Sequence, residues 1–274
     1  MARNKLNKFS EVSSFRNVYE NRNAQMPGLT NEAGEKVEMK GKWGSNHFKN
    51  EHPITLELAC GRGEYSLGLG RLFPERNFIG VDIKGARIWQ GAQIALAESL
   101  DNVAFLRTRI EQIELFFEPG EVDEIWITFP DPFLRESKTD RRLTSAPFLK
   151  RYAGLLKPGG TIHLKTDDET LYQFTLDTIA ETQEKLLYAD DDSSKLKAQS
   201  SKLFNSDDDS SKLKAQSSKL IAHSSKLFKA KLLYADDDIY SKPLPMEELA
   251  LKTYYERMHL KDGRKIKYVG FQIS

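Results

Sequence analysis

The chain has 274 residues, of which 39% are hydrophobic and 30% are charged, and 41 Lys and Arg against 40 Asp and Glu leave a net charge of +1. This composition supplies enough apolar side chains for a packed core, and no apolar run approaches the roughly 18 residues of a membrane-spanning helix. The balanced charge neither requires nor excludes a polyanionic partner.

The first 50 residues precede the regular pattern of the chain. They carry nine Lys and Arg against five Glu, and they contain no apolar segment of the kind found in secretory signals. The single cysteine, Cys60, cannot form an internal disulfide, which fits a reducing compartment. These features predict a cytoplasmic protein with a basic N-terminal extension at residues 1–50 and one domain at residues 51–274.

From residue 54 onward, apolar runs of strand length alternate with helical patterns. This alternation predicts an α/β fold with a mostly parallel sheet and helices on both faces. The expected strand and helix pairs are 54–59 and 65–73, 78–81 and 87–100, 103–106 and 110–117, 125–129 and 148–156, and 161–164 and 169–184. A helix at 246–259 and a strand at 267–273 then predict an antiparallel C-terminal edge. Ligands of such sheets bind beyond the carboxyl ends of the strands.

An internal repeat interrupts this pattern. The octapeptide KLLYADDD at residues 185–192 recurs unchanged at residues 231–238, and five copies of SSKL lie between them. These units contain too few large apolar side chains to bury, so a low-complexity, disordered insertion is expected at about residues 193–238. Removing residues 193–238 or residues 185–230 gives the same 228-residue product, so the sequence leaves open which octapeptide forms the edge strand.

A glycine-rich turn follows the first expected strand, in the sequence ELACGRG at residues 57–63. Gly61 and Gly63 let the backbone turn tightly and approach a ligand. A dinucleotide site would need a third glycine where the chain has Ser66, and the chain has no Gly-Lys-Ser/Thr for a P-loop. Glu57 would repel a pyrophosphate, but it can hold an ammonium group.

The second expected strand ends at Asp82, 21 residues after Gly61. An acidic residue in this place can accept hydrogen bonds from ribose hydroxyls. Together with Glu57, it indicates a ligand that carries an amine and a ribose but no phosphates, and S-adenosylmethionine has this chemistry. The expected cofactor-binding residues are therefore Glu57, Gly61, Gly63 and Asp82.

The fourth expected strand runs into the motif FPDP at residues 129–132, in which Asp131 lies between two prolines. The prolines stiffen the loop and restrict the residues before them to extended conformations. A carboxylate is thereby fixed at the carboxyl end of a central strand.

Basic side chains follow this motif and recur near the C-terminus. Residues 135–151 contain six basic residues against two acidic ones, which suits contacts to phosphates. We expect such contacts from Arg141, Arg142, Arg264 and Lys265.

Three further polar residues are expected on the same rim of the sheet. Asp167 ends the fifth strand in the tripeptide KTD, and Thr253 and Glu256 share one face of the C-terminal helix. His163 alternates with apolar neighbours in its strand, so we interpret it as a packed residue rather than as a ligand or a base.

Together, these motifs resemble those of the bacterial tRNA (guanine-N7-)-methyltransferases, and the resemblance covers about residues 54–273 apart from the insertion. The most specific motifs are FPDP, RRL at 141–143, LKPGG at 156–160, KTD at 165–167 and TYYER at 253–257. The resemblance implies a Rossmann-like class I methyltransferase that transfers a methyl group from S-adenosylmethionine to N7 of a guanine in the variable loop of tRNA. It implies no metal and no obligatory protein partner.

The resemblance also implies roles for single residues. Asp131 matches the catalytic residue and, with Glu57 and Asp82, a contact of S-adenosylmethionine. The residues that match contacts to the guanine or to nearby tRNA are Arg135, Asp167, Thr253 and Glu256. Ala59 replaces the first glycine of the family's turn, where alanine fits if φ is negative, and Arg109 stands where the family often has an acidic residue.

The expected chemistry follows from the target atom. Guanine N7 carries an unprotonated lone pair, so methylation needs no general base before attack. Asp131 is therefore expected to orient the guanine and to stabilise the positive charge that grows on the ring. The alternatives are a methyltransferase of the same class that acts on another RNA or a small molecule, and a non-catalytic RNA-binding protein of the same fold. A nucleotide-dependent oxidoreductase is disfavoured by Ser66 and Glu57.

Overall fold

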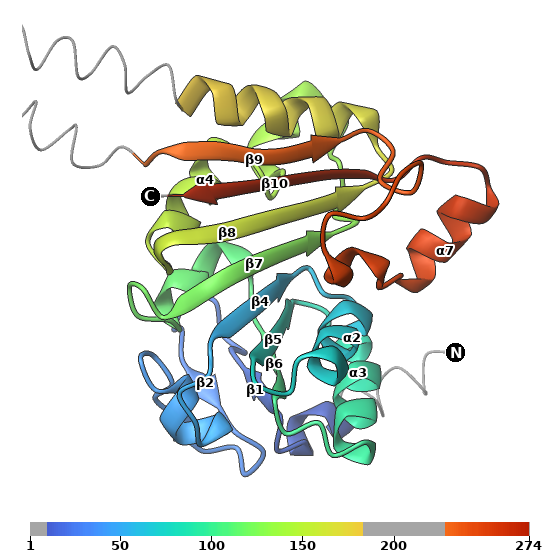
Figure 1. The fold of residues 1–274 in the computed structure, drawn as a ribbon. Coiled ribbons are helices and arrows are strands. Elements are labelled where there is room, and N and C mark those ends of the chain that lie inside the picture. The colour runs from blue at the N-terminus through green and yellow to red at the C-terminus, as the bar shows by residue number, and fades with distance from the viewer. Residues whose placement is uncertain (1–9, 183–227, 274) are drawn as a thin grey trace, which may run out of the picture.

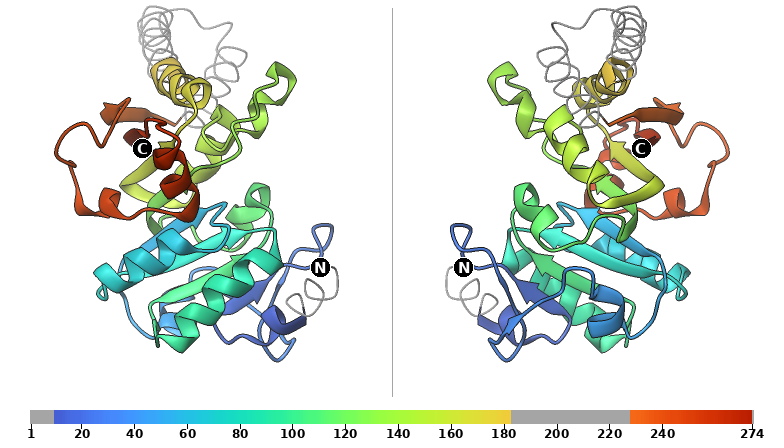
Figure 2. Two further views of the ribbon diagram at one scale, coloured as in Figure 1. Left: turned by 90° about the vertical axis from the view of Figure 1, so that its right-hand side faces the viewer. Right: turned by 90° about the vertical axis from the view of Figure 1, so that its left-hand side faces the viewer.

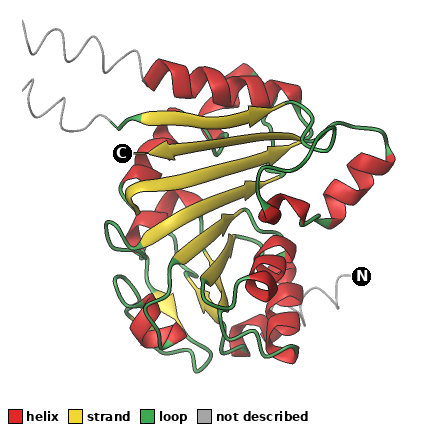
Figure 3. Ribbon diagram, in the orientation of Figure 1, coloured by secondary structure: helices red, strands yellow, loops and turns green. Residues whose placement is uncertain are grey.

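A computed structural model of the chain describes residues 10–182 and 228–273, which form a ten-stranded sheet with helices on both faces (Figures 1 and 3). The strand order is β3-β2-β1-β6-β5-β4-β7-β8-β10-β9. The strands are β1 Val18–Glu20, β2 Leu29–Thr30, β3 Lys36–Val37, β4 Ile54–Leu58, β5 Asn77–Asp82, β6 Val103–Arg107, β7 Val122–Thr128, β8 Leu156–Thr166, β9 Ala230–Asp236 and β10 Lys267–Ile273. The helices are α2 Glu64–Leu72, α3 Gly85–Ala97, α4 Ala146–Ala153, residues 169–182 and α7 Tyr254–Lys261, with the shorter η1 Val12–Ser14, η2 Trp43–Phe48, η3 Ile110–Leu115, η4 Glu136–Arg141 and η5 Glu247–Ala250.

The sheet is parallel in its centre and antiparallel at its edges. Neighbouring strands are parallel along the series β1-β6-β5-β4-β7-β8. β10 runs antiparallel to both β8 and β9, and β2 and β3 add antiparallel strands at the other edge. The predicted α/β fold with a mostly parallel sheet and an antiparallel C-terminal edge is therefore confirmed.

The central strands are buried on both faces. In β7, Ile125 and Ile127 belong to one apolar cluster, whereas Trp126 belongs to another on the opposite face, because successive side chains of a strand alternate. The first cluster includes side chains of α4 and of residues 169–182, and the second includes side chains of α2 and α3. Figure 2 shows the ribbons of these helices beside the sheet. Burial on both faces explains why these strands are continuous apolar runs in the sequence.

The N-terminal segment takes part in this sheet instead of standing apart as an extension. β1 pairs in parallel with β6, with Val18 opposite Phe105. Trp43 is fully buried, stacks on Phe117 with ring centroids 5.4 Å apart, and donates a hydrogen bond from Nε1 to the carbonyl oxygen of Phe116 at 2.8 Å. Elements of two or three residues have no periodicity, so the sequence pattern did not indicate them.

The second octapeptide forms the edge strand, which settles the question that the sequence leaves open. Ala230 of β9 is fully buried opposite Ile273, and Phe228 packs against the core. The expected insertion bounds of 193–238 are therefore wrong at their C-terminal end, because residues 230–236 belong to the sheet. The two octapeptides are identical, so only their flanking residues can distinguish them. Apolar residues that pack into the core, Phe228 and Ala230, precede the second copy. Residues 193–227 lie outside the described residues.

Two expected helices differ from those observed. Residues 110–117 were expected to form a helix, and the chain has the short 3-10 helix η3 there. The expected helix at 246–259 is divided into η5 and α7, because Thr253 caps a new helix. None of the helices in the described residues combines the length and the apolar character needed to cross a bilayer.

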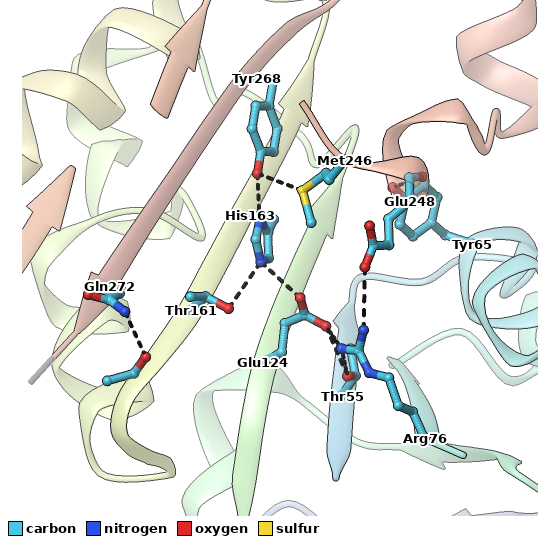
Figure 4. Close-up of polar contacts among 11 residues, drawn as sticks. Thr55, Tyr65, Arg76, Glu124, Thr161, His163, Met246, Glu248, Tyr268 and Gln272 are labelled. Carbon is cyan, nitrogen blue, oxygen red and sulfur yellow. Dashed lines mark hydrogen bonds and ion pairs between the residues drawn. The ribbon is translucent and has the colours of Figure 1, made fainter. Parts of the chain in front are cut away.

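His163 belongs to a buried polar network that connects β7, β8 and β10 (Figure 4). Its ring stacks on Trp126 at 4.2 Å, its Nδ1 lies 2.7 Å from the hydroxyl of Tyr268, and its Nε2 lies 3.0 Å from Glu124. Burial alone would raise the pKa of Glu124, but contacts with His163 and Arg76 lower it to about 2. His163 is thus packed, as interpreted from the sequence, and it also pairs with a carboxylate.

Candidate active site

The glycine-rich turn connects β4 to α2 at the carboxyl end of the sheet. Gly61 and Gly63 have φ values of +57° and +66°, a conformation that glycine adopts at little cost. A Cβ atom on Gly61 would meet no atom within 4 Å, whereas one on Gly63 would lie 2.4 Å from the ring of Phe105. Gly61 therefore faces open space, and Gly63 allows the turn to pack against β6.

Ala59 has the same left-handed conformation, with φ of +57°. The condition under which alanine fits this position, a negative φ, is therefore not met. A left-handed conformation costs a residue with a Cβ roughly 1–2 kcal/mol. Ala59 lines both cavities described below, so this backbone strain lies within the site.

Glu57 lies below the turn, and its side chain is held by three hydrogen bonds. Oε2 accepts from the backbone N–H of Ser66 at 2.8 Å and from its hydroxyl at 2.5 Å, and Oε1 accepts from the hydroxyl of Thr128 at 3.2 Å. Burial raises the pKa of Glu57 to about 7, although these hydrogen bonds oppose the shift. In the sequence, Ser66 stands only where a dinucleotide site would have its third glycine, and no motif signals its hydrogen bonds to Glu57.

Asp82 joins the ends of β4 and β5. Its Oδ2 accepts from the backbone N–H of Gly61 at 3.0 Å, and its Oδ1 accepts from the backbone N–H of Lys84 at 2.8 Å. These bonds fix the carboxylate beside the glycine-rich turn, where it lines a cavity of about 600 Å³.

Asp131 lies across this cavity, in the loop after β7. Its carboxylate is exposed, and its Oδ1 accepts from the backbone N–H of Phe133 at 3.1 Å. Phe129 and Phe133 have positive φ values of 50° and 42°, so the loop is strained on both sides of Asp131.

Arg142 anchors this loop from below. Although it was expected to contact phosphate, its side chain is buried over the ring of Phe174 at 4.4 Å. It donates hydrogen bonds to the carbonyl oxygens of Pro132 and Phe133, at 2.9 and 3.2 Å. The expected role of Arg142 in binding phosphate is therefore wrong, because its charge faces inward, whereas Arg141 is exposed and lines the 600 Å³ cavity.

A second, narrower cavity of about 80 Å³ adjoins the first. Ala59, Arg87 and Phe129 line both cavities. The narrow cavity is also lined by Glu57, Gly61, Thr128, Thr253, Tyr254 and Tyr255. The structure thus gathers five of the predicted site residues around these two neighbouring cavities: Glu57, Gly61, Asp82, Asp131 and Thr253.

The remaining predicted residues lie outside both cavities. Gly63 ends the glycine-rich turn as the N-cap of α2, and Arg135 is exposed at the start of η4. Asp167 is paired, because its Oδ2 lies 2.7 Å from Nη1 of Arg264 and 3.5 Å from Nδ1 of His259.

Thr253 and Glu256 form a capping box at the start of α7. The hydroxyl of Thr253 accepts from the backbone N–H of Glu256 at 3.2 Å, and the Glu256 carboxylate accepts from the backbone N–H of Thr253 at 3.3 Å. Glu256 is fully buried, with Oε1 at 2.7 Å from Nζ of Lys165 and 2.5 Å from the hydroxyl of Tyr240. Its carboxylate faces these partners rather than a cavity.

A parallel sheet that ends in an antiparallel strand pair, a glycine-rich turn after its first central strand and an acid at the end of the next strand are typical of class I S-adenosylmethionine-dependent methyltransferases. The family model described as "Putative methyltransferase" matches residues 51–219. The tRNA (guanine-N(7)-)-methyltransferase of Christiangramia forsetii is 40% identical over 274 residues, which cover all of this chain and 99% of that protein. The chain belongs to the family of tRNA (guanine-N(7)-)-methyltransferases.

Other relatives agree with this assignment. The tRNA (guanine-N(7)-)-methyltransferase of Bacteroides thetaiotaomicron is 41% identical over 273 residues, which cover all of this chain and 87% of the relative. Among solved structures, the 16S rRNA methyltransferase KamB matches with a TM-score of 0.51 and 16% identity, covering 88% of this chain and 96% of KamB. The similarity to KamB shows the fold alone.

Proposed function

We propose that this protein transfers the methyl group of S-adenosylmethionine to N7 of a guanine in the variable loop of tRNA, in the cytoplasm and without an obligatory protein partner. Membership of the family supports the reaction and the methyl donor. The observation that carries the assignment to this site is the exposed carboxylate of Asp131, which faces the same cavity as Asp82.

The residues around the two cavities fit the cofactor. A cavity of about 600 Å³ is of the size that binds small molecules. Asp82 would accept from the ribose hydroxyls, Glu57 would lie near the ammonium group, and Gly61 leaves room because it has no Cβ. When bound, S-adenosylmethionine supplies a methyl group that is already activated on a sulfonium.

The protein then has to position the guanine and to stabilise charge. The carboxylate of Asp131 can accept hydrogen bonds from N1–H and N2–H of the guanine, and such bonds strengthen as methylation makes the ring cationic. Because N7 has a free lone pair, no residue has to remove a proton from it. Asp131 acts in this proposal as an orienting and electrostatic group.

Exposed basic residues near the site bind the phosphate backbone of tRNA. Arg135 and Arg141 lie on the loop after Asp131, and Arg264 lies beside Asp167. Their guanidinium groups can contact phosphates, which fixes the orientation of the RNA without reading its sequence.

The test measures methyl transfer to tRNA and maps the position of the methylated guanine. The purified chain is incubated with tritium-labelled S-adenosylmethionine and bulk tRNA, and the position of 7-methylguanine is mapped by chemical cleavage. We expect label in the variable loop and a roughly 100-fold lower turnover for Asp131→Asn, with a smaller effect on cofactor affinity. Asp140→Asn, an exposed carboxylate in η4, is the matched control. No label in tRNA, label outside the variable loop, or wild-type turnover in Asp131→Asn would contradict the proposal.

A further inference from the structure

Two arginines line the narrow cavity that contains Glu57, and the sequence motifs gave neither of them a function. They are Arg62, in the glycine-rich turn, and Arg87, in the first turn of α3. Arg87 also lines the 600 Å³ cavity, so it lies where the two cavities meet.

The packing of α3 explains this position. A Cβ atom on Gly91 would lie 2.3 Å from the backbone carbonyl oxygen of Arg62, so the helix backbone rests directly on the glycine-rich turn. Arg87 precedes Gly91 by four residues and lies on the same face of the helix. Side chains of a helix also lean toward its N-terminus, which extends Arg87 over the carboxyl end of the sheet.

The two arginines differ in their partners. The guanidinium of Arg62 lies over the ring of Tyr254, 5.5 Å from its centroid. Arg87 is exposed, and among the described residues its side chain has no hydrogen-bond or ion-pair partner. The guanidinium of Arg87 is therefore available to bind a ligand where the two cavities meet.

We propose that Arg87 binds the carboxylate of the methionine part of S-adenosylmethionine. This inference rests on the cofactor placement proposed above, in which Glu57 lies near the ammonium group. The carboxylate is bonded to the same carbon as the ammonium, so a group that binds it must lie close to the same narrow cavity. A guanidinium binds a carboxylate through two parallel hydrogen bonds, a geometry that a lysine cannot supply.

The experiment compares two ligands that differ only in this carboxylate. Decarboxylated S-adenosylmethionine keeps the adenine, ribose, sulfonium and amine. The affinities of both compounds are measured by calorimetry for the wild type and for Arg87→Gln. We expect Arg87→Gln to weaken binding of S-adenosylmethionine by roughly 10- to 100-fold, as for a charged hydrogen bond. Its affinity for the decarboxylated compound should be unchanged or higher, because one positive charge near a cationic ligand is removed.

Two further variants sharpen the result. Arg87→Lys keeps the positive charge but lacks the planar guanidinium, so it should weaken binding of S-adenosylmethionine less than Arg87→Gln does. Arg62→Gln is the matched control and should not change the ratio of the two affinities. Melting temperatures check that each variant is folded.

Several outcomes would overturn the proposal. An equal loss for both ligands in Arg87→Gln would give Arg87 a structural role, and a selective loss only in Arg62→Gln would assign the carboxylate to Arg62. If the wild type bound neither ligand, the cofactor site itself would be misplaced. Because the assay contains no tRNA, it is independent of which RNA base is methylated.

Discussion

The Nζ atom of Lys165 lies 2.7 Å from Oε1 of Glu256, and neither side chain is exposed to solvent. Lys165 also donates hydrogen bonds to the carbonyl oxygens of Leu249 and Leu251, at 3.3 and 2.9 Å. Burial lowers the pKa of Lys165, which the nearby Glu256 carboxylate opposes. This pair ties the start of α7 to the end of β8, and so places Thr253 at the narrow cavity.

Lys165→Met should destabilise the fold, because it leaves the carboxylate of Glu256 buried without a counterion. Removing one member of a buried pair costs about 3–5 kcal/mol. The free energy of unfolding, measured with urea, should fall by this amount. The double variant Lys165→Met/Glu256→Gln should recover part of the loss, because no charge remains buried. If the double variant were no more stable than Lys165→Met, the pairing would not be the cause.

The basic residues should separate into two groups when they are replaced. Arg141→Gln, Arg264→Gln and Lys265→Gln remove exposed charges. The plot of log K for tRNA binding against log salt concentration should therefore become less steep by about 0.7–0.9 for each variant. Arg142→Gln should instead reduce the free energy of unfolding by about 1–3 kcal/mol, because it removes buried hydrogen bonds. Filter binding and thermal melting measure the two effects. If Arg142→Gln had normal stability and a less steep salt dependence of tRNA binding, Arg142 would contact RNA phosphates after all.

Glu57 should make both stability and cofactor binding depend on pH. Its pKa is raised from 4.5 to about 7 in the folded chain, so the folded state holds a proton that the unfolded state releases in this window. The contribution of Glu57 to stability is therefore present below about pH 4.5 and is lost as the pH rises toward 7. An ammonium group beside Glu57 favours the ionised form, so cofactor affinity should rise over the same window.

Glu57→Gln is the variant that checks this expectation, because it keeps the shape of the side chain and does not titrate. As the pH rises from 4.5 to 7, the unfolding free energy of the wild type should fall relative to that of the variant. Cofactor affinity should lose its rise with pH. Parallel pH profiles for the two proteins would show that Glu57 does not titrate in this range.

The fold was predictable where apolar residues form continuous runs of strand length. The runs that became β4 to β8 are apolar because both faces of the sheet are buried. Asp82 is the last residue of one such strand, and Asp131 lies three residues after the end of another. Partners that are distant in the sequence were not predictable. Arg142 turns inward because Phe174 lies beside it, and Glu256 is buried because Lys165, 91 residues earlier, carries the opposite charge.

The last prediction concerns the insertion, which we propose is dispensable. Long insertions between elements cost little, because the entropy of loop closure grows only with the logarithm of length. Deleting residues 185–230 joins Glu184 to Lys231 and puts a glutamate where Ala230 is now fully buried. Deleting residues 185–227 instead keeps both Phe228 and Ala230, the first residue of β9. We expect both variants to fold and to methylate tRNA, and the second to have the higher melting temperature. A folded deletion variant without tRNA methylation would show that the insertion contributes to RNA binding.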